Sequence, residues 1–205
     1  MALTEIQRFF DVYAEQWDYH FKPDRRQRLH RIFRQNLSFL KGAFLDLGCG
    51  TGILLNVFKQ ELENMPVSVM ELDLSFSMLK QNCDRHSKLP FPRYFVQGDG
   101  QKLPLKSESF DNVIAFQVFP HFLNHEAVTK EVFRVLKPGG YFCVLHLDDH
   151  QTLNALHRSL HPAVENHQLP AANVLTKFFK QHGFLRIKSS EHKGLYFVLV
   201  QKPLY

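Results

Sequence analysis

The sequence predicts an α/β protein, a three-layer sandwich in which helices cover both faces of a mostly parallel sheet. From residue 43 onward, short apolar runs alternate with amphipathic helical stretches, which is typical of parallel strands joined by helical crossovers. The runs are nearly continuous in apolar residues, as expected of strands that are covered on both faces. We expect strands at 43–47, 67–72, 94–96, 113–116 and 141–147, and helices at 53–62, 75–84 and 124–136.

The N-terminal part departs from this alternation. Apolar residues recur every three or four positions over 3–17 and again over 29–40, which predicts two amphipathic helices. Pro23 interrupts the pattern between them. We expect residues 1–40 to form a helical lid over the rest of the fold, as the family resemblance given below implies.

The C-terminal part also differs. A helix is expected near 171–182, followed by two apolar stretches, 184–189 and 196–200, on either side of a turn at Lys193-Gly194. This pattern predicts an antiparallel strand pair on the sheet edge. We expect one domain over 1–205, with the lid at 1–40, a core at 41–147, and further helices and the strand pair at 148–205.

Composition excludes several classes of protein. The 205 residues are 44% hydrophobic with a net charge of +5, which excludes a disordered chain and the dense basic charge of a histone. Three cysteines do not suggest a disulfide scaffold, and we find neither an apolar run of membrane-spanning length nor a secretory signal. We therefore expect a cytoplasmic protein. Its 12 histidines are an excess that composition does not explain.

The segment Phe44–Gly52, FLDLGCGTG, is the sharpest local signal of a binding site. It runs from a predicted strand through three alternating glycines into a predicted helix. Glycine lets the backbone approach a ligand closely, and a helix N-terminus offers free N–H donors. Open α/β sheets bind ligands at this end of their strands. The spacing is G-x-G-x-G, whereas dinucleotide sites carry G-x-G-x-x-G.

Four segments in chain order carry a family resemblance: DLGCGTG (46–52), ELDLSFSML (71–79), GDGQKLPLKSESFDNVIAF (98–116) and VFRVLKPGG (132–140). They resemble the successive motifs of class I S-adenosylmethionine-dependent methyltransferases, closest to the small-molecule branch that includes the quinone-biosynthesis C-methyltransferases. The segment FFDVYAEQWD (9–18) resembles the part of that branch that closes over the cofactor. The resemblance implies a Rossmann-like fold, S-adenosyl-L-methionine as cofactor, S-adenosyl-L-homocysteine as product, and in-line methyl transfer to a small-molecule acceptor.

The resemblance also implies which residues hold the cofactor. Asp73, the acid of the family's D-x-S pattern, is expected on the ribose hydroxyls, with Glu71 as the alternative. Asp99 is expected on the adenine amine and Gln117 beneath the sulfonium. Cys49 is expected as a small residue packed under the cofactor, without a catalytic role. The full implied set is Asp46, Gly48, Cys49, Gly50, Gly52, Asp73, Leu74, Asp99, Gly100, Gln101 and Gln117.

The substrate side of this fold is built after strands four and five and from the N-terminal lid, where several histidines fall. His121 and His146 are candidate general bases, because an imidazole with a near-neutral pKa suits that role. Residues 118–122 (VFPHF) and 154–157 (NALH) also resemble small bacterial methyltransferases, which implies that His121, His146, Asn154 and His157 meet in one pocket. Phenylalanines of the lid and after strand four are candidates for an apolar lining. The expected substrate-binding residues are Tyr13, Trp17, His20, Phe122, Asn154 and His157.

A divalent metal is an alternative role for the same histidines. His146, Asp148 or Asp149, and His157, with His121, are residue types that hold such ions. We do not predict a metal, because the pattern is compatible with one but not diagnostic. A third alternative is that the histidines have neither role.

The basic residues of the second N-terminal helix, between Lys22 and Arg34, are interpreted as a solvated helix face. An RNA or protein methyltransferase that uses this helix is the alternative, but the segment after strand four reads Gln117-Val-Phe-Pro120, without an Asn-Pro-Pro-Tyr-type motif. We therefore expect a small-molecule partner and no nucleic acid. A nicotinamide-dependent oxidoreductase and a non-catalytic binding module are further alternatives. The sequence leaves open the substrate, the accepting atom and the oligomeric state, a homodimer included.

Overall fold

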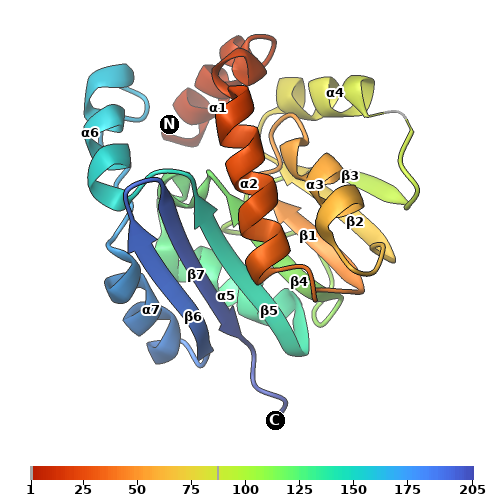
Figure 1. Cartoon of the computed structure of the whole chain (residues 1–205). Coiled ribbons are helices and arrows are strands. Elements are labelled where there is room, and N and C mark those ends of the chain that lie inside the picture. The colour runs from red at the N-terminus through yellow and green to blue at the C-terminus, as the bar shows by residue number, and fades with distance from the viewer. Residues whose placement is uncertain (1, 87) are drawn as a thin grey trace.

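A seven-stranded sheet lies at the centre of the computed structural model, which describes residues 2–86 and 88–205, with only the backbone at 2–4 and at His20. Strands β1 to β5 run parallel in the order β3-β2-β1-β4-β5, and β7 pairs antiparallel with both β5 and β6 (Figure 1). The predicted parallel sheet with an antiparallel edge hairpin is therefore confirmed. The strands are β1 (Ala43–Leu47), β2 (Ser68–Asp73), β3 (Arg93–Gln97), β4 (Phe110–Phe116), β5 (Leu136–His146), β6 (Leu185–His192) and β7 (Leu195–Gln201).

Strand β5 begins five residues earlier than the apolar run 141–147 predicts. Its first residue, Leu136, pairs with Phe110, and the register shifts before Tyr141 pairs with Asn112. The turn-like sequence Lys137–Gly140 is thus an irregular part of the strand. A Cβ on Gly140 would lie within 3.0 Å of the backbone oxygens of Lys137 and Asp111. This crowding explains why a residue without a side chain occupies the position.

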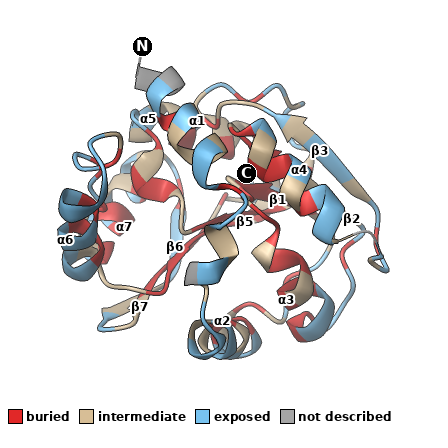
Figure 2. Ribbon diagram, turned by 90° about the horizontal axis from the view of Figure 1, so that it is seen from above, coloured by how far each residue is buried: buried red, intermediate tan, exposed pale blue. Residues whose placement is uncertain are grey.

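Helices cover both faces of the sheet. The α2 and α3 side chains share one apolar core with Phe44, Val69 and Ile114 of the sheet. The α5 and α7 side chains share the other with Leu45, Val113 and residues of β7. Figure 2 shows the buried residues along the strands and on the inward helix faces. The helices are α1 (Ala2–Tyr13), η1 (Trp17–His20), α2 (Pro23–Asn36), α3 (Ile53–Glu61), α4 (Phe76–Arg85), η2 (Phe119–His121), α5 (His125–Val135), α6 (His150–Leu160) and α7 (Ala172–Gln181).

Three helices that follow strands begin at side-chain caps. Ser75, Asn124 and Asp149 accept the free N–H groups of Met78, Ala127 and Thr152 at the starts of α4, α5 and α6. Such caps satisfy backbone donors that have no partner within the helix. Helix α3 has no side-chain cap, because its N-cap residue is Gly52.

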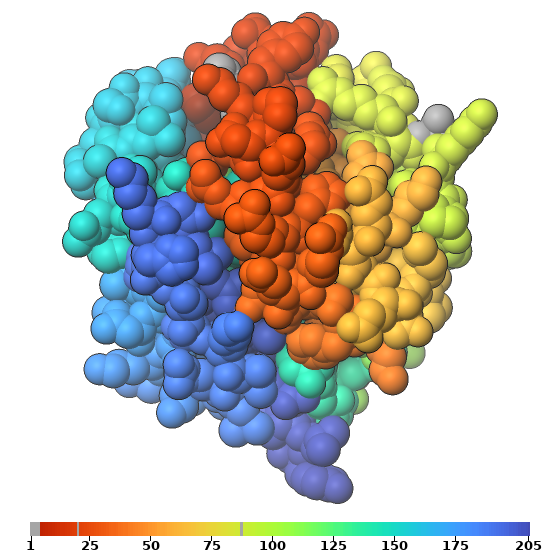
Figure 3. Space-filling model, in the orientation of Figure 1, coloured from red at the N-terminus to blue at the C-terminus, as the bar shows by residue number. Residues whose placement is uncertain are grey.

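Helices α1 and α6 lie above the carboxyl ends of the parallel strands (Figure 1). Asp11 of α1 accepts hydrogen bonds from the Ser75 hydroxyl and from the Ser77 backbone, and Asp18 pairs with Arg85 and accepts the Thr51 hydroxyl. The N-terminal segment thereby closes over the strand ends, and Figure 3 shows it running down the middle of one face. No helix among the described residues combines the length and apolarity that a bilayer crossing requires.

Three of the five arginines of α2 make contacts to other parts of the molecule. Arg25 forms an ion pair with Asp148, Arg28 donates to the carbonyl oxygen of Leu147, and Arg34 pairs with Glu61. These contacts tie α2 to the segment after β5 and to α3. They reduce the basic charge that this helix face would present to a polyanion.

Candidate functional site

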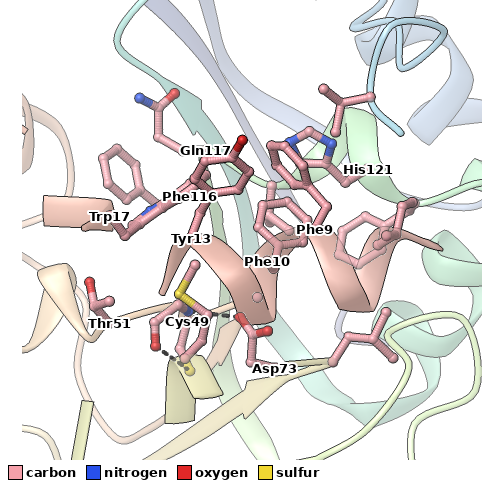
Figure 4. A pocket seen from close by; sticks show the side chains of 18 of the residues that line it. Phe9, Phe10, Tyr13, Trp17, Cys49, Thr51, Asp73, Phe116, Gln117 and His121 are labelled. Atoms are coloured by element: carbon pink, nitrogen blue, oxygen red, sulfur yellow. Dashed lines mark hydrogen bonds between the residues drawn. The ribbon is translucent and has the colours of Figure 1, made fainter. Parts of the chain in front are cut away.

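A cavity of about 520 Å³ lies between the strand ends and the N-terminal segment. One part, here called the loop half, is lined by residues at the ends of β1 to β4, at 48–51, 72–74, 98–101 and 117. The other part, here called the histidine half, is lined by α1, by residues 118, 121 and 122 beyond β4, and by α6 with the residues that follow it. Figure 4 shows Cys49, Thr51 and Asp73 on one side of this space and His121 with Phe9 on another.

Three glycines shape the loop half. Gly48, Gly50 and Gly52 all have positive φ angles, of 74°, 53° and 80°, which glycine adopts without steric cost. A Cβ on Gly48 would meet Val118 at 2.4 Å and one on Gly52 would meet Asn82 at 2.4 Å, whereas one on Gly50 has no neighbour within 4 Å. Gly48 and Gly52 thus permit close packing of the protein, and Gly50 leaves room for a ligand.

Asp73 joins the glycine loop to the end of β2. Its carboxylate accepts hydrogen bonds from the backbone N–H groups of Gly50 and Ser75, both at 2.8 Å. The side chain is only 8% exposed but lines the cavity. Burial raises the pKa of Asp73 to about 6, against the opposing effect of these two hydrogen bonds.

Two further carboxyl groups lie behind the loop. Asp46 and Glu71 are neighbours in the β1–β2 register, and Asn82 donates to Glu71 at 2.8 Å. Neither Asp46 Oδ2 nor Glu71 Oε1 has a hydrogen-bond partner among the described residues. Burial raises the pKa of Glu71 to about 7 and, together with the charges of Glu71 and Asp73, raises the pKa of Asp46 well above its usual range. The loop half therefore concentrates buried carboxyl groups that favour a cationic ligand.

The ends of β3 and β4 complete the loop half. Asp99 accepts hydrogen bonds from the backbone and side chain of Gln101, and a Cβ on Gly100 would meet the Phe122 ring at 2.6 Å. Gln117 follows β4 with a φ of 58°, an uncommon conformation for a residue with a side chain. Strain of this kind concentrates at functional sites, and Gln117 lines the cavity.

The N-terminal segment supplies the aromatic roof of the cavity. Phe9 contacts His161 and Phe10 contacts His121, with ring centroids 5.0 and 5.2 Å apart. Tyr13 and Trp17, which were predicted to contact substrate, also line the cavity. The remaining lining of the histidine half is mainly aliphatic and comes from α1, α6 and the segment after α6: Ile6, Leu153, Leu156, Leu160 and Val164.

Three imidazoles meet at the far side of the histidine half. Nδ1 of His121 lies 2.9 Å from Nδ1 of His167, and the His121 and His157 ring centroids are 5.0 Å apart. His157 Nδ1 lies 2.6 Å from the carbonyl oxygen of His167. Burial, followed by the neighbouring imidazoles of His157, His167 and His146, lowers the pKa of His121 well below its usual range. The cluster is therefore neutral at pH 7.

Two residues expected at the substrate lie outside the cavity lining. His146 ends β5 on the sheet face that carries Tyr196, is 1% exposed, and has no hydrogen-bond partner at either ring nitrogen among the described residues. Asn154 bonds through both amide atoms to the Leu169 backbone, which fixes the segment after α6. The expected contact at His20 concerns a side chain outside the described part of the chain.

The expected cofactor residues divide similarly. Asp46 and Gly52 lie behind the loop, whereas the other nine line the cavity: Gly48, Cys49, Gly50, Asp73, Leu74, Asp99, Gly100, Gln101 and Gln117. Burial, followed by the surrounding acids, raises the pKa of the Cys49 thiol well above its usual range, so it is neutral and a poor nucleophile.

Some lining residues carry no local sequence signal. The Arg25–Asp148 pair and the apolar face of α6 reach the cavity only through tertiary packing. His167 touches the site through His121, 46 positions away in sequence. Within residues 2–86 and 88–205, no group of three or more His, Cys, Asp or Glu side chains is arranged to hold a metal ion.

Sequence and structure comparisons relate this chain to known proteins. A sequence model described as a methyltransferase domain matches residues 45–144. This segment belongs to the class I S-adenosylmethionine-dependent methyltransferase family. Malonyl-[acyl-carrier protein] O-methyltransferase of Marinomonas sp. (strain MWYL1) is 39% identical over 97 residues, 47% of this chain and 35% of the relative. Demethylmenaquinone methyltransferase of Streptomyces griseus is 35% identical over 96 residues, 47% of this chain and 38% of the relative.

The matched segments thus span little more than a third of these relatives' length. A solved chain from the complex between the Haloferax volcanii Trm112 methyltransferase activator and its methyltransferase matches 95% of this chain and 97% of its own, with a TM-score of 0.78 and 17% identity. This likeness extends the shared fold beyond residues 45–144 to almost the whole chain.

The loop half of the cavity carries groups that suit the cofactor of this family. S-Adenosylmethionine carries two cationic groups, the amino group and the sulfonium, and two ribose hydroxyls. The cavity-lining carboxylate of Asp73 and the open space at Gly50 suit those groups, and the carboxyl groups of Asp46 and Glu71 lie buried behind the loop. The residues present are therefore compatible with this cofactor.

Proposed function

We propose that the chain is an S-adenosylmethionine-dependent methyltransferase that acts on a small molecule with an apolar body. The observation that carries this proposal is a single cavity that joins the loop half to the histidine half. Such a cavity places the two reactants of a transfer reaction side by side, and holding them in line supplies much of the catalysis.

The loop half is proposed to hold the cofactor, which when bound supplies a methyl group on positively charged sulfur. Asp73 would hold the ribose hydroxyls, and Leu74 and Asp99 would hold the adenine, as in the family that the sequence resembles. Gly48 and Gly50 would allow the backbone to come close to the methionine part, with Asp46 buried behind the loop. No protein nucleophile is needed, in agreement with the neutral thiol of Cys49.

The histidine half is proposed to hold the methyl acceptor. Its lining is mainly aromatic and aliphatic, and the Arg25–Asp148 ion pair, which also reaches the cavity, is internally neutralised. This favours an uncharged apolar body over an acidic one. The relatives' names also describe methyltransferases of small molecules or of carrier-bound acyl groups.

His121 is proposed as the residue that receives a proton from the acceptor. It lines the cavity, whereas His146 does not. The roof over both halves would exclude water, and its contacts through Asp11 and Asp18 keep it closed over the loop half. We propose that residues 1–40 include this lid.

The competing functions have less support. The glycine spacing and the acids behind the loop are not those of a nicotinamide site. A polyanionic substrate on α2 would meet arginines that are bound to Asp148, to Glu61 and to the Leu147 carbonyl oxygen. We therefore retain the small-molecule reaction.

Titration calorimetry with S-adenosylmethionine, S-adenosylhomocysteine and NADH tests the loop half. We expect saturable binding of the first two and none of NADH. Gly50→Ala should weaken cofactor binding by about 1–3 kcal/mol, or about 5- to 150-fold, because the added methyl group occupies ligand space. The matched control is Gly194→Ala: Gly194 has a similar φ of 85° but a Cβ there would contact only Arg28. Binding of NADH alone, or an equal effect of both substitutions, would overturn this assignment.

A further inference from the structure

The contact between His121 and His167 is the most informative feature of the histidine half. Both partners approach through Nδ1, at 2.9 Å. Two imidazoles in such contact need one shared hydrogen, because two lone pairs or two N–H groups facing each other repel. The two rings must therefore be opposite tautomers, one protonated on Nδ1 and the other on Nε2.

The two possible arrangements differ in what His121 presents to the cavity. His121 lines the cavity and His167 does not, and His121 Nε2 makes no hydrogen bond to any described side chain. If His121 carries its hydrogen on Nδ1 and donates it to His167, its Nε2 lone pair is free within the site. The opposite arrangement would present an N–H group there. His167 thus selects whether the site accepts or donates a hydrogen.

The groups around His121 leave it without an ionic partner. Phe10 packs against it from α1, His157 from α6, His167 from the loop between α6 and α7, and His146 lies nearby from β5. His157 donates its own Nδ1 hydrogen to the His167 carbonyl oxygen, so it too is fixed in one tautomer. No described carboxylate makes a hydrogen bond to His121, and a second imidazole takes the position in which many catalytic histidines have an acid.

We propose that His167 is a positioning residue that holds His121 with Nδ1 protonated and Nε2 as a hydrogen acceptor, so that the site takes an uncharged methyl acceptor whose reacting oxygen or nitrogen carries a hydrogen. This inference rests on the proposed function and narrows its substrate class. Anionic acceptors are excluded, because they would bring a negative charge against a lone pair in an apolar cavity.

The His121–His167 pair then accounts for the proton that the reaction releases. The bond that forms joins the methyl carbon to the oxygen or nitrogen, and the bond that breaks joins that carbon to sulfur. The hydrogen of the acceptor moves as a proton to His121 Nε2. The resulting imidazolium keeps its Nδ1–H bond to His167, and the proton passes to solvent when the product leaves.

Nitrogen-15 NMR of the imidazoles tests the tautomers without any substrate. We expect His121 and His157 with hydrogen on Nδ1, and His167 with hydrogen on Nε2. Replacing His167 by Leu should release His121 into the Nε2–H form, whereas His167→Gln should preserve the Nδ1–H form, since the amide oxygen accepts that hydrogen. Finding His121 as the Nε2–H tautomer in the wild-type protein would overturn the proposal.

Binding of matched ligands tests the substrate class. The probes are 4-ethylphenol, 4-ethylaniline and 4-ethylbenzoate, titrated into the protein saturated with S-adenosylhomocysteine. We expect the phenol and the aniline to bind and to perturb the His121 Nε2 resonance, and the benzoate not to bind. His167→Leu should weaken phenol binding about three- to tenfold, as for one lost hydrogen bond, and His167→Gln should restore it.

Two outcomes would overturn the proposal. One is benzoate binding as tight as phenol binding, and the other is binding of none of the three probes. If S-adenosylhomocysteine binds in these experiments, such a result rejects only the substrate class. If S-adenosylhomocysteine itself fails to bind, the proposed function fails instead.

Discussion

The loop half and the histidine half of the cavity use burial in opposite chemical senses. In the loop half, burial raises the pKa of Asp73 to about 6, and directly behind it burial raises the pKa of Glu71 to about 7. In the histidine half, burial lowers the pKa of His121 well below its usual range, and behind the lining it lowers the pKa of His146 to about 3. In both halves burial disfavours the charged form of the side chain. The acids of the loop half are stabilised in their ionised form by a cationic ligand, whereas the imidazoles of the histidine half remain neutral hydrogen-bond acceptors.

The difference shows how one cavity can distinguish its two ligands. A ligand that brings positive charge lowers the energy of the buried carboxylates and gains nothing beside the imidazoles. An uncharged apolar ligand that donates a hydrogen bond fits the imidazoles and leaves the carboxyl groups unsatisfied. Under the proposed function, the two halves would therefore distinguish their ligands by charge as well as by shape.

The largest expected effect is the loss of Asp73. Asp73→Ala should weaken S-adenosylmethionine binding by about 1–3 kcal/mol, because it removes a ligand contact and leaves the N–H groups of Gly50 and Ser75 without their acceptor. Wild-type affinity should rise with pH through about 6, since the ionised carboxylate is the better acceptor, and Asp73→Asn should flatten this rise. Calorimetry between about pH 5 and pH 7.5 measures both effects.

The control is Asp84→Ala, which removes an exposed acid paired with Lys80 on α4. It should leave affinity and its pH dependence unchanged. Unaltered cofactor affinity in Asp73→Ala would move the ribose contact to another acid. Weakened binding of 4-ethylphenol in the same variant would contradict the independence of the two halves.

The fold and the loop half could be predicted from the sequence better than the histidine half, for a physical reason. The glycine loop and Asp73 lie on short turns at strand ends, where local chain geometry determines their neighbours. The parallel sheet follows from the alternation of apolar runs and helices, and its strands lie close to the predicted ranges. The early start of β5 at Leu136 depends on a register shift against β4, which no local pattern encodes.

The histidine half depends on contacts between distant segments. Phe10, His121, His157 and His167 come from four separate elements. His146 was expected beside them and lies near His121, but it stays outside the cavity lining, and side chains alternate between sheet faces. Its neighbour Leu145 belongs to the α2–α3 core, and His146 faces the other way, toward Tyr196. Position along a strand was predictable, whereas the surroundings of the side chain were not.

A smaller effect is expected from His146. Its folded pKa of about 3 lies below its ordinary value of 6.5, so the unfolded chain binds more protons between these values. Stability contributed by neutral His146 is therefore present above pH 6.5 and lost as the pH falls. Glu71 acts in the opposite sense, because its raised pKa makes stability fall as the pH rises toward 7.

His146→Leu should remove the histidine contribution and lessen the loss of stability on acidification. At neutral pH it should change the free energy of unfolding by only about 1 kcal/mol, because neither ring nitrogen has a described partner to lose. Urea unfolding at about pH 4.5 and pH 7 measures the change, with exposed His192→Leu as control. A larger loss at neutral pH than at acidic pH would show that His146 has a polar partner.

The smallest expected effect concerns the lid, which is the element common to both halves. Asp18 holds it to the loop half through Thr51 and Arg85, while Phe9 and Phe10 hold it to the histidines. The Asp18–Arg85 pair is partly exposed, so Asp18→Asn should cost less than about 1 kcal/mol. We expect S-adenosylhomocysteine to dissociate a few-fold faster with little change in its association rate, because the lost ion pair stabilises only the closed lid and its loss therefore speeds opening. Glu126→Gln, which breaks the exposed pair with Lys130 on α5, is the matched control.

Stopped-flow measurements of both ligands then decide how the two halves are linked. Faster dissociation of S-adenosylhomocysteine alone means that the lid opens locally over the loop half. Equally faster dissociation of 4-ethylphenol means that the lid opens as one body.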